Sequence, residues 1–594
     1  MRYLLLVHIG PVQDFIASAR RSRDLWFGSW LLSELSKAAA HAISEQEGAQ
    51  ESLIFPAPSD ASLLKASSEF SATNRIVALI QQPPDTLADE VEKAVRLRLE
   101  AIRKGAFGQV SGPFNRGIAE AQVDDLLEFF WVAVPINGTP YAAARERAEA
   151  LMAARKSTRA FGPATWGSNS PKSSLDGIRE SVIPEGAYPS RREDEQRRQE
   201  KTEALYLQYG AGPAERLSGV DLLKRHGQRG QESRFPSTSH IASLPLLKGL
   251  SDVQGVQTLL DEYTDKLPQQ VISQERIPKR FAHAIFGTLD GSLFFESRLS
   301  ESLEGEQLRE AARALNEFLA SAANGKSPIP YYALLLADGD RMGQVIDAQS
   351  SSDEHRQLSA VLTEFAGKVQ TIVEENYGGA LVYAGGDDVL AFLPLHTAID
   401  CAQTLADTFS EQMGVFRDRA GAPATFSAGI AVNHHLEPLS DALDFARQAE
   451  QKAKAVPGKN ALAVGVIKRG GVPRMIAGKW DALGSSLKRL ISFHRQDALP
   501  DGAAYQLRDV ALRLGGEGIF RNNPTLQDAV RKESMRILSR KKAEHGARGL
   551  SDEVFKEMEA LIMDMDQPIE QLADELIIAR LFANAYDQAY GPLK

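Results

Sequence analysis

The sequence predicts a multidomain α+β protein. At 594 residues the chain is about four times the length of a typical domain, so three to five domains are expected. Apolar runs with strand character alternate with helical patterns near the N-terminus and again after residue 326, whereas residues 471–594 read as helices to the end. Apolar residues make up 43% and charged residues 25%, which is ordinary for a globular protein with a well-packed core.

Charge and cysteine content exclude several classes of protein. The chain has 68 basic and 78 acidic residues, a formal net charge of -10, which argues against unselective coating of DNA. Cys401 is the single cysteine, so an intrachain disulfide and any zinc site with two or more thiolates are impossible. No apolar run approaches the roughly 18 residues that span a bilayer, and the first residues do not resemble a secretory signal. We expect a cytoplasmic protein.

Residues 1–161 read as one unit of alternating strands and helices. Residues 3–9 predict a buried strand that ends at Gly10-Pro11, and an arginine-rich helix is expected from about residue 12 to 40. Further strands are predicted at 75–80 and 129–134, each with a helical stretch after it. The usual fold for such a pattern is a sheet with helices on one face.

Residues 162–325 form a different kind of region. Gly, Pro, Ser and charged residues dominate 162–240, and helical periodicity returns at 241–325. We predict a mostly helical intervening domain. Its boundary is placed near residue 326, where the segment SPIPYYALLLADGD leads into a strongly apolar strand.

Residues 326–470 carry the clearest pattern. Strands are predicted at 331–337, 380–384, 389–393, 425–432 and 461–466, and helices at about 354–376, 397–413 and 440–455. In chain order the first six of these elements are βαββαβ, the ferredoxin-like arrangement, followed by one more helix and strand.

Acidic residues occupy two positions in this arrangement. Asp338 and Asp340 follow the apolar strand YYALLLA, and Asp387 and Asp388 lie in the hairpin between two apolar strands. Because the first strand of a βαββαβ sheet lies beside the hairpin, we expect the two pairs to meet at one edge of the sheet.

Carboxylates gathered at one point need a positive charge to neutralise them. Mg²⁺ or Mn²⁺ would do so and would bring substrate phosphates with it, and two such ions about 3.5–4 Å apart promote in-line displacement at phosphorus. Gly385 and Gly386 permit a tight turn and leave room for a ligand. The alternative is a plain hairpin in which Gly-Gly-Asp-Asp serves only the turn.

Basic residues follow downstream. Lys452 and Lys454 end the helix predicted at 440–455, and Lys459 lies just before the next strand. Lysines at these positions can hold a triphosphate as point charges. The alternative is that they only complement the helix dipole.

These motifs resemble those of a known family. Asp338-Gly-Asp340 and Gly385-Gly-Asp-Asp388 look like the polymerase/cyclase palm that is shared with GGDEF-type diguanylate cyclases. Gly10-Pro-Val-Gln13 with the following FIASARRSRDLWFGSWLLSEL, Phe235-Pro-Ser-Thr-Ser239 and Ala453-Lys-Ala-Val-Pro-Gly-Lys-Asn460 resemble the large subunit of type III-B CRISPR effector complexes. The similarity covers most of the chain.

The resemblance implies two palm domains, of which the second is catalytic. Residues 1–161 would form the non-catalytic first palm, 162–325 the helical intervening domain, 326–470 the catalytic palm with its GGDD hairpin, and 471–594 a C-terminal helical bundle. Relatives carry zinc cysteines near Lys172-Ser-Ser-Leu-Asp-Gly177 and Glu215-Arg-Leu-Ser218, where this chain has serine. We therefore expect no zinc, and hydrogen bonds in its place.

The implied activity is the synthesis of cyclic oligoadenylates from ATP, switched on when the guide-loaded complex binds target RNA. The expected catalytic residues are Asp338, Asp387 and Asp388, the expected metal ligands are these three and Asp340, and the expected nucleotide-binding residues are Gly385, Gly386, Lys454 and Lys459. The expected partners are the other effector subunits, crRNA, target RNA and ATP, with no membrane. Many relatives begin with an HD nuclease domain. This chain starts at the first palm and no histidine is followed by Asp, so no HD-type DNase activity is expected.

Two other functions stay open. The chain could be an architectural subunit that binds nucleotide and organises the crRNA complex without catalysis, or a stand-alone cyclase that makes a cyclic dinucleotide. Arg20, Arg21 and Arg23 argue against the stand-alone enzyme, because arginines beside the first strand can bind guide-RNA phosphates. The alternative for these arginines is a solvated helix face.

Overall fold

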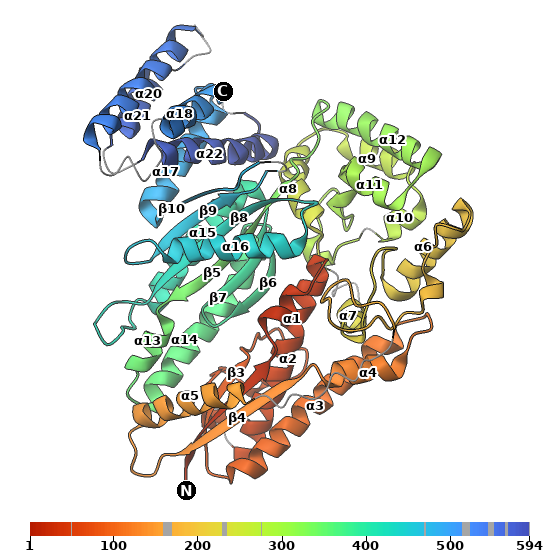
Figure 1. Cartoon of the computed structure of the whole chain (residues 1–594), viewed down its shortest axis with the longest axis vertical. Coiled ribbons are helices and arrows are strands. Elements are labelled where there is room, and N and C mark those ends of the chain that lie inside the picture. The colour runs from red at the N-terminus through yellow and green to blue at the C-terminus, as the bar shows by residue number, and fades with distance from the viewer. Residues whose placement is uncertain are drawn as a thin grey trace.

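In the residues that the structure describes, two β-sheets with flanking helices organise the chain (Figure 1). The computed structural model describes residues 1–48, 50–158, 169–228, 235–274, 276–468, 471–513, 523–544, 550, 552–564 and 568–592. The expected domain boundaries at residues 161 and 470 lie outside these ranges, so the division into domains stays a prediction. No described helix is both long enough and apolar enough to cross a bilayer.

The first sheet has the strand order β2-β3-β1-β4, with antiparallel neighbours throughout. Its elements are β1 (Tyr3–Gly10), α1 (Gln13–Ala17), α2 (Ser22–Glu47), β2 (Leu53–Phe55), β3 (Arg75–Ile80), α3 (Pro84–Gly108), α4 (Arg116–Asp124), β4 (Glu128–Pro135) and α5 (Tyr141–Ser157). Helices α2 and α3 pack on one face through residues such as Leu35 and Val95. Helix α5 covers the other face through Ala144 and Ala148, so the expectation of helices on one face only is wrong. The single helix expected over 12–40 is two helices.

The second sheet has the strand order β10-β9-β8-β5-β7-β6. Its elements are β5 (Tyr331–Asp340), α13 (Met342–Ala348), α14 (Ser352–Gln370) with a π-helical end (Thr371–Asn376), β6 (Ala380–Gly385), β7 (Asp388–Leu393), α15 (Leu395–Met413), β8 (Thr425–His434), α16 (Leu439–Lys454), β9 (Ala461–Val466) and β10 (Arg474–Lys479). Strands β5 to β8 have the predicted ferredoxin-like order. Helices α14 and α15 pack on one face, through Phe365 and Leu405, and α16 packs on the other through Phe445.

The expectation that the chain is helical from residue 471 onward is wrong for β10. Residues 474–479 pair with β9 in antiparallel register and extend the second sheet at its edge. Their side chains are mostly half-buried, so they lack the continuous apolar run by which the other strands of this sheet were predicted.

Helices dominate the described part of residues 162–325. They are α6 (Glu195–Tyr209), α7 (Gly219–His226), α8 (Thr238–Leu250), α9 (Val256–Thr264), α10 (Gln269–Gln274), α11 (Glu296–Ser302) and α12 (Gly305–Ala323). Helices α6 and α7 join the core of the first sheet through residues such as Leu205 and Leu223. Helices α8 to α12 enclose a core of their own, which includes Tyr263 and Phe318. The described helices of this region are therefore divided between two cores, and a single intervening domain stays a prediction.

The C-terminal helices extend the core of the second sheet, and the last of them packs against β9 and β10 (Figure 1). They are α17 (Ser485–Arg495), α18 (Asp501–Arg513), α20 (Pro524–Glu544), α21 (Asp552–Met563) and α22 (Ile569–Tyr590). The apolar positions read from the sequence at helical spacing are buried in α21 and α22: Val554, Met558, Leu561, Ile562, Leu572, Leu576, Ile577 and Leu581.

Hydrogen bonds join the two serine stretches, 172–177 and 215–218, at which hydrogen bonds were expected in place of zinc. The buried carboxylate of Asp221 accepts bonds from the hydroxyls of Ser173 and Ser218, both at 2.7 Å, and from the Ser218 backbone N–H at 2.7 Å. Burial raises the pKa of Asp221. One carboxylate thus links loops that are about 45 residues apart in the sequence.

Asp221→Ala is expected to lower the stability of this region by about 2–4 kcal/mol. The change leaves three donors in a buried site without their acceptor. Thermal unfolding of the full chain, followed by circular dichroism, measures the effect. Addition of EDTA to the wild-type chain is expected to leave the unfolding temperature unchanged, and a drop there would contradict the assignment of stability to hydrogen bonds.

Candidate active site

The end of β5 and the β6–β7 hairpin bring the two acidic pairs together. β5 pairs with β7 so that Ala337 lies opposite Val389, which puts Asp338 beside Asp388. The backbone N–H of Gly339 donates to the carbonyl of Asp387 at 3.2 Å. The pairs therefore meet at one edge of the sheet, as the strand order predicted.

The carboxyl groups at this edge lie close enough to change one another's titration. Burial, the adjacent Asp338 carboxylate and Asp388 raise the pKa of Asp387 well above its ordinary value. Burial, with the charges of Asp338 and Glu450, raises the pKa of Asp388 to about 7, although Lys454 opposes this. The folded site therefore disfavours the charged forms of Asp387 and Asp388.

Lys454 supplies one positive charge to this cluster. Its ammonium donates to Asp338 and lies 2.5 Å from Oε1 of Glu450. Burial lowers the pKa of Lys454, but the hydrogen bonds to Asp338 and Glu450 raise it above its ordinary value overall. Both Glu450 and Lys454 lie on α16, one turn apart. Glu450 was not predicted as a site residue. Its position four residues before Lys454 was the available indication, because residues at that spacing lie on the same face of a helix.

The donor atoms fit a divalent cation, although the site is not preformed. In the part of the chain that the structure describes, no group of three or more Asp, Glu, His or Cys side chains has the spacing of a metal centre. Asp338, Asp387 and Asp388 present carboxylate oxygens alone, which are the ligands that Mg²⁺ and Mn²⁺ prefer. The raised pKa values of Asp387 and Asp388 mean that the metal-free chain disfavours their charged forms, which a bound cation would stabilise.

Asp340 has different surroundings from the other three aspartates. It is fully buried, and its Oδ2 accepts hydrogen bonds from Thr425 Oγ1 at 2.8 Å, Ser427 Oγ at 2.9 Å and the Asn460 backbone N–H at 2.9 Å. Its Oδ1 has no hydrogen-bond partner among the described residues. These contacts anchor β8 and the turn before β9, and the metal-ligand role expected for Asp340 stays a prediction.

Three glycines let the backbone pack closely around the carboxylates. A Cβ on Gly339 would lie 2.8 Å from Oδ2 and 2.9 Å from Cβ of Asp387, and one on Gly385 would lie 1.7 Å from the Tyr383 hydroxyl oxygen. Gly386 has φ +68°, the left-handed conformation that glycine adopts freely. The importance of Gly339 and Tyr383 was not predicted, because each depends on a neighbour in space.

Of the two lysines expected to bind nucleotide, Lys454 is the last residue of α16 and Lys459 lies in the turn before β9. Residues 457–460, here called the basic turn, include Lys459, whose carbonyl accepts a hydrogen bond from the Lys479 ammonium. Gly458, Lys459 and Asn460 have φ values of +76°, +53° and +49°. Lys479 was not predicted, because it lies on β10.

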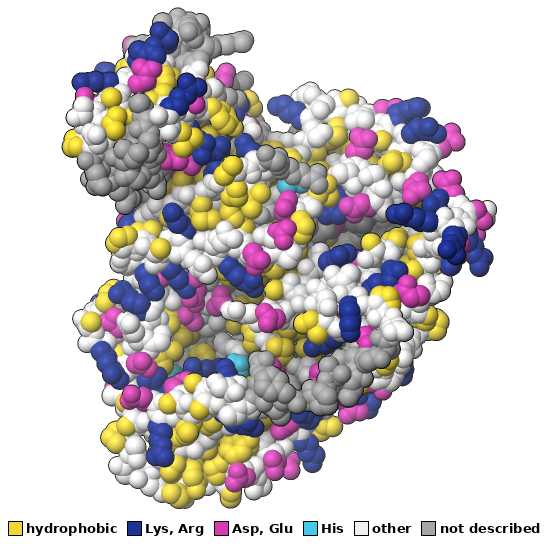
Figure 2. Space-filling model, viewed as in Figure 1, with side chains coloured by type: hydrophobic (Ala, Val, Ile, Leu, Met, Phe, Trp, Pro, Cys, Tyr) yellow, Lys and Arg dark blue, Asp and Glu magenta, His cyan; other side chains and the backbone are white. Residues whose placement is uncertain are grey.

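The predicted RNA-binding arginines differ in their surroundings. Arg20 is exposed. Arg21 pairs with Glu215 at 3.1 Å and lies over the ring of Tyr206, and Arg23 donates to the carbonyl of Gln228. Contacts within the chain therefore engage Arg21 and Arg23. On the face shown in Figure 2, basic and acidic side chains are interspersed over the described surface, as the small net charge leads one to expect.

The hairpin tip lies against the end of the first sheet. A Cβ on Gly386 would lie 3.7 Å from Thr73 and 3.8 Å from Phe55. Nearby, Arg356 of α14 donates to the carbonyl of Leu53 at 3.0 Å and to that of Glu51. The first sheet therefore forms part of the surroundings of the carboxylates.

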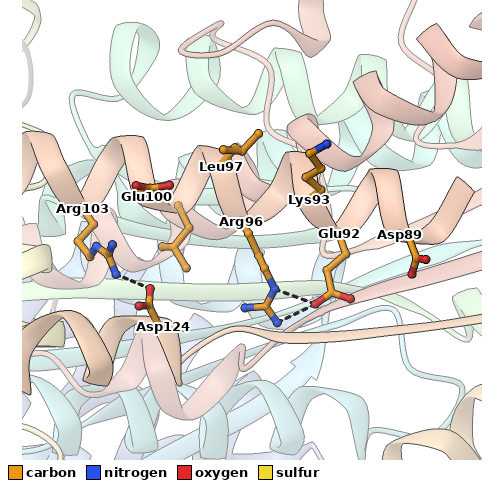
Figure 3. A pocket seen from close by; sticks show the side chains of 9 residues that line it. Asp89, Glu92, Lys93, Arg96, Leu97, Glu100, Arg103 and Asp124 are labelled. Carbon is orange, nitrogen blue, oxygen red and sulfur yellow. Dashed lines mark hydrogen bonds and ion pairs between the residues drawn. The ribbon is translucent and has the colours of Figure 1, made fainter. Parts of the chain in front are cut away.

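A separate open depression of about 720 Å³ runs along α3, and none of the site residues lines it. Figure 3 shows two pairs among its charges: Arg96 with Glu92, and Arg103 with Asp124. Since these side chains neutralise each other on an exposed helix surface, the depression is not a candidate site.

Asp388→Asn is expected to stabilise the metal-free chain. The pKa of about 7 in the folded chain exceeds the ordinary value near 4, so the folded state binds the proton more tightly. Wild-type stability therefore falls as the pH rises from about 4 to 7, whereas the amide carries no charge. Thermal unfolding in EDTA is expected to show a gain of about 1–3 °C at pH 8 and almost none at pH 5. A larger gain at pH 5 would contradict this origin.

Comparison with known proteins identifies relatives. The family model described as Cas10/Cmr2, second palm domain, matches residues 331–463, which include the four aspartates, Lys454 and Lys459. The model described as CRISPR-associated protein Cmr2, N-terminal, matches residues 4–104. A curated relative, the CRISPR system Cmr subunit Cmr2 of Pyrococcus furiosus, is 26% identical over 569 residues. The match covers 79% of this chain and 62% of the relative, so the chain spans less than two thirds of the relative's length.

Solved structures share the fold. Chains of the type III-B Cmr-beta complex, in its apo state and bound to cognate target RNA, have TM-scores of 0.62 and 0.63 with this chain and are 13% identical to it. The matches cover 98% of this chain and 82% and 83% of those chains. The resemblance to the large subunit of type III-B complexes, inferred from the sequence motifs, is confirmed.

Proposed function

We propose that this chain, a relative of the Cas10 and Cmr2 proteins, is the large subunit of a type III CRISPR effector complex that makes cyclic oligoadenylates from ATP. The observation that carries the proposal is the convergence of Asp338, Asp387 and Asp388 at one sheet edge, with raised pKa values for Asp387 and Asp388. Clustered carboxylates beside a lysine are the arrangement that nucleotidyl transfer requires.

In this proposal, the three aspartates hold the divalent ions and the lysines hold the triphosphate. Bound Mg²⁺ or Mn²⁺ would supply Lewis-acid stabilisation of charge on the phosphates. Lys454 neutralises Asp338 in the free chain and is close enough to the same edge to bind phosphate once the cluster is neutralised. Lys459 offers a second positive charge from the basic turn. Gly385 and Gly386 are buried in the metal-free chain, and as glycines they would allow a nucleotide to approach the hairpin backbone closely.

The proposed partners are the other type III-B subunits, crRNA and target RNA. Arg20 is the candidate for contact with guide-RNA phosphate, because it is the exposed member of the arginine group. In this view target RNA acts as the activator and ATP as the substrate.

The test is an assay of the assembled complex. Incubation with ATP, Mg²⁺ and matching target RNA is expected to give cyclic oligoadenylates, detected by chromatography and mass spectrometry, and non-matching RNA is expected to give none. Bound but unconverted ATP would favour an architectural subunit. Product from the isolated chain without RNA would favour a stand-alone cyclase.

A further inference from the structure

We propose that Asp340 is a positioning residue that holds the basic turn against the end of β5, and that it is not a metal ligand. The inference rests on the proposed function in one respect, which is that the basic turn meets the triphosphate of ATP. It also assigns Asp340 a different role from that of Asp338, which lies two residues earlier on the same strand.

The contacts of Asp340 place it at a junction of three segments. In the sheet register Asp340 lies opposite Thr425 and Asp338 lies opposite Ser427, and both hydroxyls donate to Oδ2 of Asp340. The third donor is the backbone N–H of Asn460, directly before β9. One buried oxygen therefore ties together β5, β8 and the basic turn.

Those three donors also argue against a bond from Oδ2 to a metal. A carboxylate oxygen has two lone pairs, and Oδ2 already serves donors at 2.8, 2.9 and 2.9 Å. A ligand role for Asp340 would therefore depend on its other oxygen, Oδ1.

The basic turn needs such an anchor because its backbone is strained. Gly458, Lys459 and Asn460 are all left-handed, a conformation that costs free energy for residues with a side chain. Two charged groups hold the turn: Asp340 accepts from the Asn460 N–H, and the Lys479 ammonium donates to the Lys459 carbonyl.

The consequence for the reaction follows from the position of Lys459. Both anchors hold the peptide group that joins Lys459 to Asn460, so the placement of the Lys459 ammonium depends on the turn keeping its shape. Because Asp338 and Asp340 share one strand end, that strand sets both the carboxylate cluster and the basic turn. Asp340 then acts on ATP through Lys459.

The test uses Asp340→Asn in the full-length chain and in the assembled complex. Trypsin cleavage after Lys459, followed by mass spectrometry, is expected to become at least about fivefold faster, because the turn is released. In the complex the KM for ATP is expected to rise about 5–10-fold, while the Mg²⁺ concentration for half-maximal activity changes less than twofold. If Asp340→Asn does not fold, Thr425→Val removes one donor and is expected to shift cleavage and KM in the same direction by smaller factors.

Asp418→Asn is the matched control. Asp418 is also a buried carboxylate that accepts two backbone N–H bonds, from Ala420 and Ala422 at 2.9 Å, in the turn before β8. This variant is expected to leave cleavage after Lys459 and the KM unchanged. Unchanged cleavage in Asp340→Asn, or a raised Mg²⁺ requirement with or without faster cleavage, would overturn the proposal. A wild-type complex that makes no oligoadenylate would refute the proposed function, while the cleavage assay would still test the anchor.

Discussion

Replacing Asp387 and Asp388 together by Asn is expected to lower oligoadenylate synthesis by the assembled complex at least about 100-fold. The change keeps the size of both side chains but removes the charges that the proposed divalent ions require. Asp387 lies in the hairpin turn and Asp388 is the first residue of β7, and both side chains are half-buried, so the fold is expected to persist. Product formation from ATP with target RNA present, followed over time by chromatography, measures the loss.

A matched control distinguishes the loss of charge at the site from the loss of two negative charges elsewhere on the chain. Asp441→Asn with Asp444→Asn removes two exposed carboxylates from α16, the helix that also carries Lys454. This double variant is expected to keep wild-type activity, and native mass spectrometry is expected to show normal assembly for both. Retention of more than a tenth of the activity by the Asp387 and Asp388 variant would refute the catalytic assignment.

Gly339→Ala is expected to lower the kcat for ATP conversion about 10–100-fold with little change in assembly. The new methyl group would lie 2.9 Å from Cβ of Asp387 and 2.6 Å from Cγ of Met342, so the Asp387 side chain must move. A shift of about 1 Å at a reacting group can cost about two orders of magnitude in rate. Steady-state kinetics of the complex give the effect.

The control for this prediction lies four residues along the chain. Gly343, in α13, has no atom within 4 Å of an added Cβ, so Gly343→Ala is expected to leave the kcat unchanged. Equal activity for the two alanine variants would show that the position of Asp387 does not depend on contact with Gly339.

The second sheet could be predicted where apolar runs and helical stripes were continuous. Strands β5 to β9 and helices α14 to α16 appear within a few residues of their predicted ends, and the ferredoxin-like strand order then required the acidic pairs to meet. β2 was missed because it has three residues, and β10 because its side chains are mostly half-buried. The break between α1 and α2 was also missed. At this break the Lys224 ammonium donates hydrogen bonds to the carbonyls of Phe15 and Ser18, and Lys224 is remote in sequence.

The roles of individual site residues were harder to predict. Asp338 and Asp340 are two residues apart on one strand, and a period of two gives them equivalent positions in any sequence pattern. What distinguishes them is the partner on the neighbouring elements: Lys454 for Asp338, and Thr425, Ser427 and Asn460 for Asp340. Those partners follow from strand register and the shape of a turn, which a single sequence does not encode locally.

Gly386 of the β6–β7 hairpin lies beside the first sheet, which supplies none of the aspartates of the candidate site. Thr73 and Phe55 form a wall beside the hairpin, and Arg356 fixes the neighbouring strand to α14. A relative displacement of the two sheets would change this contact at the hairpin that carries Asp387 and Asp388. If the proposed function holds, binding events on the N-terminal half of the chain are expected to alter the reaction through this contact, without any change in the reacting groups themselves.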